Sequence, residues 1–529
     1  MAMIKVNAPV PSLSTLLISL ILIITIRATD GRDFPVEEAT IDEIQRAFTR
    51  NKMTSRELVD FYLDRIQTLN PVLRGVLEVN PDARDQADVA DEERESNQGI
   101  RNLGPLHGIP VLLKDSIATK DKLNTTAGSY ALLGSTVARD AGVVEKLRAA
   151  GAVILGKASM TEWYNFRAMG KAPNGWCARG GQGQNPYVQS GDPCGSSSGS
   201  AISVAANMVT VSLGSETHGS ILCPSDHNSV VGFKPSVGLT SRAGVIPVYP
   251  PHDTIGVISR TVSDSVYVLD AIVGFDPRDE EATREAAKFI PPGGYMQFLN
   301  KGGLKGKRLG VVRELFVNGS RIHTVFEHHL EILRQKGATI VYDLEIANIS
   351  TILNSGKNGE VTAMLAGFKI AVNEYLEELV TSPVRSLADV IAFIENNPDL
   401  EKTKEYGQYT FIASEKTNGF GEKEKKAVEL MQKLTRDGFE KLMTANELDA
   451  IVVPGTRGIS VLAVGGFPGI TVPAGYNDDD GMPFGIMFGG LRGFEPKLIE
   501  IAYAFEQATM IRRPPSNSFQ CINDFKTSL

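Results

Sequence analysis

Two clusters of glycine and serine residues are the part of this 529-residue chain best suited to nucleophilic chemistry. Residues 195–200 read GSSSGS, and residues 214–220 read GSETHGS. Glycine allows a sharp turn and close backbone approach, and consecutive N–H groups in such a turn bind an anion. Acyl transfer requires a hydroxyl beside an oxyanion-binding turn of this kind. The clusters therefore predict a serine nucleophile, with two ordinary Ser/Gly turns around a strand as the alternative interpretation.

A lysine at the end of an apolar segment is the candidate base. Residues 106–115 read LHGIPVLLKD, so the apolar run ends at Lys114. Lysine accepts a proton only in its neutral form, and burial lowers the pKa of an amine toward that state. Lys114 is thus either a buried base or an exposed lysine at a strand end.

Taken together, these segments resemble the amidase signature family and, within it, the peptide-amidase branch of Ser-cisSer-Lys hydrolases. Residues 217–221, THGSI, match the family's nucleophile turn and make Ser220 the candidate nucleophile. In the family a second serine precedes the nucleophile by a fixed interval, and 220 − 196 = 24 places it at Ser196. Lys114 takes the place of the family's catalytic lysine. The resemblance implies a catalytic triad of Lys114, Ser196 and Ser220, with Ser196 following a cis peptide bond.

The resemblance also implies an oxyanion hole made by the backbone N–H groups of Thr217, His218 and Gly219, together with that of Ser220. His218 departs from the family, which has Gly here, and from the peptide-amidase branch, which has Asp. A bulky residue tolerates unusual backbone dihedrals less well than Gly or Asp. We therefore expect His218 to lower simple amide hydrolysis, either by misaligning the turn or by directing the acyl group to an acceptor other than water.

Other arrangements of these serines fit the sequence less well. Ser197 or Ser198 becomes the relay serine if the alignment slips. Residues 195–199 also match the Gly-x-Ser-x-Gly elbow of Ser-His-Asp hydrolases, but a loop precedes them where the elbow needs a strand. None of the seven histidines has a context that marks it as a triad base.

The four cysteines are too few for a disulfide scaffold. Cys194 and Cys223 each lie next to one of the motifs. We expect buried free thiols at these positions, with proximity of the two in space as the alternative. No Cys or His spacing resembles a structural zinc site, and we expect neither a metal nor a cofactor.

Hydrophobic periodicity indicates the elements that must position these residues. Strands alternate with capped amphipathic helices, which predicts an α/β fold. The expected strands are 76–79, 152–155, 308–312, 339–342 and 451–454, and the expected helices are 55–69, 82–97, 141–150, 321–336 and 496–507, with further helices over 359–448. Around the Ser clusters we expect a helix over 201–207 and a strand over 208–213. The resemblance implies the amidase signature fold, a large mixed twisted β-sheet flanked by helices on both faces, in one domain over residues 34–515.

Residues 1–28 have the character of a leader. The apolar core over residues 13–26 has 14 residues, within the ~7–15 of a signal peptide and short of the ~20 of a membrane span. We expect a cleaved signal peptide, with an uncleaved anchor as the alternative, and hence a secreted or lumenal protein. Glycosylation sequons follow at Asn124, Asn318 and Asn348.

The composition narrows the function further. A net charge of −8 and the lack of any basic cluster argue against a nucleic-acid partner. The leading hypothesis is a serine amidase that hydrolyses a linear carboxylic amide, of a small molecule or a peptide, through an acyl-enzyme and without an obligate membrane span. The alternatives are an acyltransferase on the same fold and a catalytically weakened, amidase-like binding protein.

Overall fold

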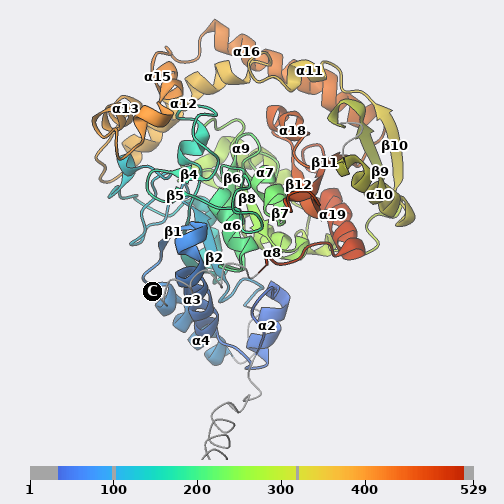
Figure 1. Ribbon diagram of the computed structural model, residues 1–529, viewed down its shortest axis with the longest axis horizontal. Helices are drawn as coiled ribbons and strands as arrows, with labels where there is room; N and C mark the ends of the chain where they lie inside the picture. The colour runs from blue at the N-terminus through green and yellow to red at the C-terminus, as the bar shows by residue number, and fades with distance from the viewer. Residues whose placement is uncertain (1–33, 98–102, 317–320, 517–529) are drawn as a thin grey trace, which may run out of the picture.

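The computed structural model describes residues 34–97, 103–316 and 321–516, so the predicted leader over residues 1–28 lies outside the described part. An eleven-stranded sheet crosses the molecule (Figure 1). In spatial order its strands are β1 (Val76–Val79), β3 (Val153–Ala158), β2 (Pro110–Lys114), β6 (Val211–Glu216), β8 (Thr254–Ser259), β7 (Val231–Lys234), β12 (Gly469–Tyr476), β13 (Pro483–Gly489), β11 (Ala450–Pro454), β9 (Arg308–Val312) and β10 (Thr339–Leu344).

The sheet is mixed, as predicted. β2 pairs in parallel with β3 and β6, and β9 pairs in parallel with β10 and β11. The other neighbouring strands are antiparallel. A separate two-stranded ribbon is formed by β4 (Trp176–Cys177) and β5 (Gly181–Gln182).

Helices cover both faces of this sheet. Every residue of β2, β6, β7, β8, β11 and β13 is buried, which is the pattern of strands covered on both sides. α8 (Val262–Ile272) and α19 (Glu495–Thr509) pack on each other and on the sheet, and α6 (Ser198–Ala205) and α7 (Leu222–His227) do the same. The predicted α/β sheet flanked by helices is therefore confirmed.

The first helices are α2 (Ile41–Thr49), α3 (Ser55–Leu73) and α4 (Ala83–Asn97). α3 begins at the predicted residue 55, and α4 begins one residue after the predicted 82. Thr40 and Glu43 form a capping box before α2, and Thr54 and Glu57 form one before α3. α3 continues four residues beyond the predicted end because Leu73 is buried in the main core.

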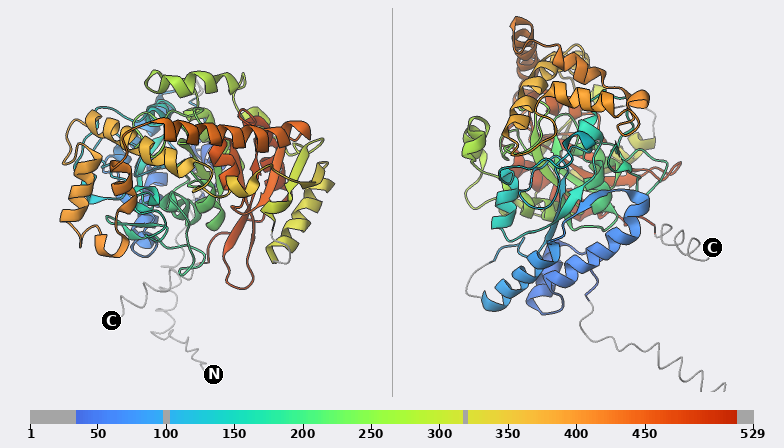
Figure 2. Two further views of the ribbon diagram at one scale, coloured as in Figure 1. Left: turned by 90° about the horizontal axis from the view of Figure 1, so that it is seen from above. Right: turned by 90° about the vertical axis from the view of Figure 1, so that its left-hand side faces the viewer.

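The segment before the C-terminal strands is helical, as predicted, and forms a layer of its own. Its helices α12 (Glu360–Glu378), α13 (Leu387–Asn396), α15 (Tyr409–Glu415) and α16 (Glu422–Leu434) lie in an arc along one side of the sheet (Figures 1 and 2). A second apolar cluster ties this layer to the loop after β3, and in it Phe368 stacks on Phe411 with 5.0 Å between ring centres. The remaining helices are α5 (Gly142–Ala149), α9 (Glu280–Ala286), α10 (Arg321–Gln335), α11 (Ile349–Ile352), α14 (Thr403–Tyr406), α17 (Lys441–Ala445) and α18 (Ile459–Gly465).

Two boundaries near the serine clusters differ from the prediction. α6 begins at Ser198 instead of residue 201, and β6 covers Val211–Glu216 instead of residues 208–213. Asn207 has a left-handed backbone with φ 55°, which ends the helix and delays the strand. β6 then continues through Gly214 to Glu216 because these residues pair with β8, a cross-strand partner that local apolarity does not reveal.

No helix among the described residues is long and apolar enough to cross a membrane.

Candidate active site

The predicted base lies at the carboxyl end of β2, in the middle of the sheet. Lys114 is fully buried, and its Nζ lies 2.7 Å from Ser196 Oγ, 3.0 Å from Ser197 Oγ and 2.9 Å from the carbonyl oxygen of Ser215. Its Nζ also lies 4.8 Å from the centre of the Tyr164 ring. The exposed strand-end alternative is thus wrong for Lys114.

Burial governs the ionisation of this lysine. Removal of the amine from water lowers the pKa of Lys114 well below its usual value, although the negative charges of Glu216 and Asp253 oppose part of the shift. Oxygen atoms surround Nζ, but among the described residues no carboxylate forms an ion pair with it. An amine with a lowered pKa and a hydroxyl oxygen 2.7 Å away is suited to act as a general base.

The first serine cluster surrounds Lys114 from α6 and the loop before it. The peptide bond between Gly195 and Ser196 is cis, as the family resemblance implies. Ser197 N–H donates a hydrogen bond to the Ser220 carbonyl oxygen at 3.1 Å, so the two clusters are in contact. Ser198 Oγ donates to the Cys194 carbonyl oxygen at 2.6 Å, which turns its hydroxyl away from Lys114.

The second cluster forms a tight turn between β6 and α7 that ends at Ser220. Among the described residues, no group accepts a hydrogen bond from the N–H groups of Thr217, His218, Gly219 or Ser220. Gly219 has φ 84°, and a Cβ at this position would meet Ile459 Cγ2 at 2.9 Å, so the turn requires glycine. Four successive free N–H groups next to a serine are suited to binding an oxyanion.

Ser220 is nearly buried, with 8% of its surface exposed. No hydrogen bond joins Ser220 Oγ to Ser196 Oγ, or to any other group in the described part of the chain. The structure therefore brings Lys114 next to Ser196 and the Ser220 backbone next to Ser197. Contacts of this kind often tighten only when substrate is bound.

Two buried carboxylates hold the turn, and neither was predicted. Glu216 Oε2 accepts the N–H groups of Ile221 and Leu222 at 2.7 and 3.0 Å, at the start of α7. Asp253 Oδ1 and Thr217 Oγ1 lie 2.5 Å apart. Glu216 lies inside the second cluster, where its sequence position could have suggested this role. Asp253 lies outside every motif and comes close to the turn only because β8, which follows it, pairs with β6.

His218 is directed away from the turn that contains it. Its Nδ1 lies 2.8 Å from Glu360 Oε1 at the start of α12, and its Nε2 lies 3.1 Å from Ser460 Oγ on α18. His218 is not among the residues with positive φ, so the strain that the sequence suggested is not present there. Burial lowers the pKa of His218, but the charge and hydrogen bond of Glu360 outweigh this and raise it above its usual value.

The expectation of free thiols at Cys194 and Cys223 is wrong, because these residues form a disulfide. Contact between the serine clusters brings their Cα atoms within 5.8 Å. The disulfide joins the residue before Gly195 to the residue three positions after Ser220. His227 lies close to both sulfur atoms, but a disulfide offers no thiolate to a metal. Cys177 is a buried free cysteine, and burial raises its thiol pKa to about 11.

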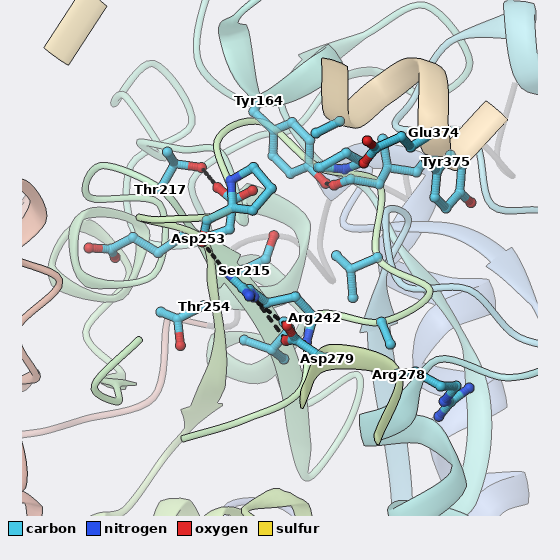
Figure 3. Close-up of a pocket in the computed structure, with 18 of the residues that line it drawn as sticks. Tyr164, Ser215, Thr217, Arg242, Asp253, Thr254, Arg278, Asp279, Glu374 and Tyr375 are labelled. Atoms are coloured by element: carbon cyan, nitrogen blue, oxygen red, sulfur yellow. Dashed lines mark hydrogen bonds and ion pairs between the residues drawn. The ribbon is translucent and has the colours of Figure 1, made fainter. Parts of the chain in front are cut away.

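A cavity of about 220 Å³ adjoins the turn. Ser215 of β6, Thr217 just after β6 and Tyr164 on the loop after β3 line it. Glu374 and Tyr375 of α12 also line it, and Figure 3 shows them beside Tyr164, with Ser215 below. The helical layer thus forms one wall of a cavity whose other wall contacts Lys114.

Comparisons with known proteins agree with this arrangement. The sequence model of the amidase family matches residues 57–461. A probable amidase from Arabidopsis thaliana is 60% identical over 482 residues, which cover 91% of this chain and 92% of the relative. The peptide amidase from Stenotrophomonas maltophilia is 40% identical, with a TM-score of 0.85 over 92% of this chain and 100% of that chain. A peptide amidase in complex with the competitive inhibitor chymostatin gives the same identity and TM-score, over 91% of this chain and 100% of that chain.

The extent of these matches makes the assignment plain: the chain belongs to the amidase family, a family of hydrolases that cleave the C–N bond of amides.

Proposed function

We propose that this amidase-family hydrolase cleaves a linear carboxylic amide through an acyl-enzyme on Ser220, with Ser196 and Lys114 as the proton relay. The observation that carries the proposal is the buried Lys114 amine, 2.7 Å from Ser196 Oγ, in the same site as a turn with four free N–H groups. Lys114, with its lowered pKa, is the proton acceptor.

In the first half-reaction Ser220 Oγ attacks the carbonyl carbon of the amide. Its proton passes to Ser196 Oγ, while the Ser196 proton passes to Lys114 Nζ. The electron pair of the carbonyl π bond moves to the oxygen, which the N–H groups of residues 217–220 stabilise. Collapse of this intermediate breaks the C–N bond, and the relay returns the proton to the leaving nitrogen.

In the second half-reaction water replaces the amine. It attacks the Ser220 ester and gives its proton to the same relay, and collapse releases the carboxylic acid and restores the Ser220 hydroxyl. Transfer of the acyl group to an amine or alcohol would follow the same path, with that acceptor in place of water.

A peptide or acyl amide is the proposed substrate class. Its support is the similarity to the peptide amidase from Stenotrophomonas maltophilia over nearly the whole described chain. The 220 Å³ cavity beside the turn has room for part of such a substrate.

Turnover of a panel of peptide and acyl amides by the purified chain tests the proposal. Ser220→Ala should abolish release of acid and amine. Ser203→Ala is the matched control, because Ser203 is a buried serine of α6 whose Oγ has no hydrogen-bond partner among the described residues. Assaying with and without an added amine acceptor, and measuring both acid and transfer product, separates hydrolysis from acyl transfer. Normal turnover by Ser220→Ala would overturn the proposal.

We also propose that the protein enters the secretory pathway. The leader of residues 1–28 motivates this location, and the Cys194–Cys223 disulfide supports it, because disulfides persist mainly in oxidising compartments.

A further inference from the structure

The cavity beside the catalytic turn has an excess of unpaired negative charge. Five carboxylates line it. That of Asp279 is paired with Arg242, and the other four are those of Glu216, Asp253, Glu374 and Glu378. Among the described residues, none of the four has a basic side chain within ion-pair distance. Glu374 and Glu378 are one helical turn apart on α12 and therefore share a face of that helix.

The two arginines in the cavity wall do not balance this charge, because each is already paired. Arg242 donates to Asp279 through both Nε and Nη2. Arg278 donates to Glu145 at 2.8 Å and to Asp276 at 3.2 Å. The side chains that line the cavity therefore carry negative charge that no arginine of the wall neutralises, and this charge favours binding of a cation.

Unused hydrogen-bonding groups lie in the same wall. Ser215 and Tyr375 are only 6% and 9% exposed. Their hydroxyl oxygens, Ser215 Oγ and Tyr375 Oη, have no hydrogen-bond partner among the described residues. Both residues line the cavity, and Figure 3 shows Ser215 in its central wall below Tyr164. A hydroxyl oxygen accepts hydrogen bonds, so each of these two oxygens keeps an unused acceptor in the cavity wall.

We propose that this cavity binds a positively charged group of the substrate, an ammonium or a guanidinium. The inference rests on the proposed amide hydrolysis and assigns its substrate class. The N–H groups of such a cation can donate hydrogen bonds to the hydroxyl oxygens without partners. Its positive charge is attracted by the carboxylates that have no ion pair. A neutral apolar group would leave both unsatisfied.

The position of the cavity places this charge close to the reacting bond. Ser215 provides the carbonyl oxygen 2.9 Å from Lys114 Nζ, and Tyr164 presents its ring to the same amine. Thr217 lines the cavity and lies three positions before Ser220. The charged group of the substrate therefore lies within a few bonds of the amide that is cleaved, on the acyl side or on the amine side of that amide.

Pairs of substrates matched in length separate charge from shape. On the acyl side, Nα-acetyl-lysinamide is compared with Nα-acetyl-norleucinamide, which has the same carbon chain without the ammonium group. On the amine side, N-acetyl-1,4-diaminobutane is compared with N-butylacetamide. We expect a kcat/KM preference of roughly 5- to 30-fold for the cationic member of at least one pair, decreasing as salt is added.

Glu374→Gln should remove most of that preference by lowering the kcat/KM of the cationic member. Glu377→Gln is the matched control, because Glu377 lies on α12 but does not line the cavity. Glu374 is a sharper probe than Glu378, which also borders a neighbouring cavity lined by Arg139.

The outcomes distinguish the two proposals. Equal kcat/KM for charged and neutral members of both pairs, with Ser220→Ala inactive on each, would overturn the cation site and leave the amidase proposal intact. A preference that Glu374→Gln and Glu377→Gln reduce equally would also overturn it. Turnover that survives Ser220→Ala would instead remove the proposed function itself.

Discussion

At the scale of single residues, the ionisation of Lys114 decides whether the relay works. Burial lowers its pKa well below the usual value, so the amine loses its proton at a lower pH than a free lysine does. The neutral form is the one that accepts a proton, and its fraction grows as pH rises through that lowered pKa. Amide hydrolysis should therefore increase with pH to a plateau reached well below the usual lysine pKa of about 10.4.

Substitution of this lysine checks the same point. Lys114→Ala should reduce kcat by about 10²–10⁴, the usual contribution of a positioned base. Lys120→Ala serves as control, because Lys120 is exposed and outside the site. Steady-state kinetics over pH 5–10 measure both effects, and a Lys114→Ala variant with nearly normal turnover would show that another group accepts the proton.

The contacts of His218 reverse the expected effect of replacing it. The sequence suggested that His218 lowers amide hydrolysis, whereas its contacts with Glu360 and Ser460 indicate that it supports the site. Glu360 is 1% exposed, and burial raises its pKa, but His218 and His252 outweigh this and bring that pKa below its usual range. His218→Asp would remove the partner of a buried carboxylate and add a second negative charge. We expect hydrolysis to fall and stability to decrease by roughly 2 kcal/mol, less than for a fully buried pair because the imidazole is 30% exposed.

A second substitution identifies charge as the cause. Adding Glu360→Gln to His218→Asp should recover part of the lost stability in thermal unfolding. The contribution of protonated His218 is fully present below the unfolded histidine pKa of about 6.5 while Glu360 is ionised, and it is lost as pH rises through the raised folded pKa of His218. Improved hydrolysis by His218→Asp alone would instead support the expectation drawn from the sequence.

Residues inside motifs could be predicted, whereas residues that only approach the motifs in space could not. Lys114, Ser196 and Ser220 lie in segments that resemble the motifs of the amidase signature family, and that resemblance identified them. Glu360 follows His218 by 142 positions and lies in a region without any motif. Its contact depends on the packing of α12 over the turn, which no local pattern encodes.

At the scale of elements, one covalent link joins the two loops of the site. Cys194 precedes the first serine cluster, and Cys223 lies in the first turn of α7, 29 positions later. Cross-linking segments at such a separation stabilises a fold by about 2–4 kcal/mol. The sequence indicated that the two could be neighbours, but their bond required the loops to converge through the Ser197–Ser220 backbone contact.

Removal of this link should affect both stability and turnover. The double variant Cys194→Ser/Cys223→Ser should lose about 2–4 kcal/mol of unfolding free energy and part of its kcat, because the relay and the turn are then held together only by noncovalent contacts. Cys177→Ser, at the buried free cysteine, is the matched control. Unchanged denaturation midpoints and turnover in the double variant would show that the disulfide does not hold the site.

At the scale of the whole molecule, the strand and helix pattern predicted the α/β class, and the resemblance implied the mixed sheet. The order of the eleven strands could not be derived, because it places β6 between β2 and β8 through pairings of residues some 40 to 100 positions apart. Apolar periodicity identifies strands but not their neighbours. The predicted limits of the domain, residues 34–515, stay a prediction.

The proposed secretory location makes a prediction about the mature chain. When the full chain is expressed in a eukaryotic secretory host, its N-terminus should lie between about Thr29 and Phe34. Asn348 should carry glycan more readily than Asn124, because Asn348 is exposed, whereas Asn124 Nδ2 donates to Glu78 Oε1 at 2.9 Å. Asn318 lies outside the described residues. Intact-mass analysis that finds Met1–Asp30 retained on a cytosolic protein would contradict the proposal.

The central claim, that Ser220 is the nucleophile, is tested most directly by a fluorophosphonate probe and peptide mass mapping. One covalent label should form on Ser220, as the serine oxygen displaces fluoride from phosphorus. The label should be lost in Ser220→Ala and kept in Ser203→Ala. Lys114→Ala should slow labelling, because the base no longer removes the Ser220 proton. Labelling of Ser220→Ala at the wild-type rate, or a label mapped to Ser196 or Ser197 in the wild type, would show that Ser220 is not the nucleophile.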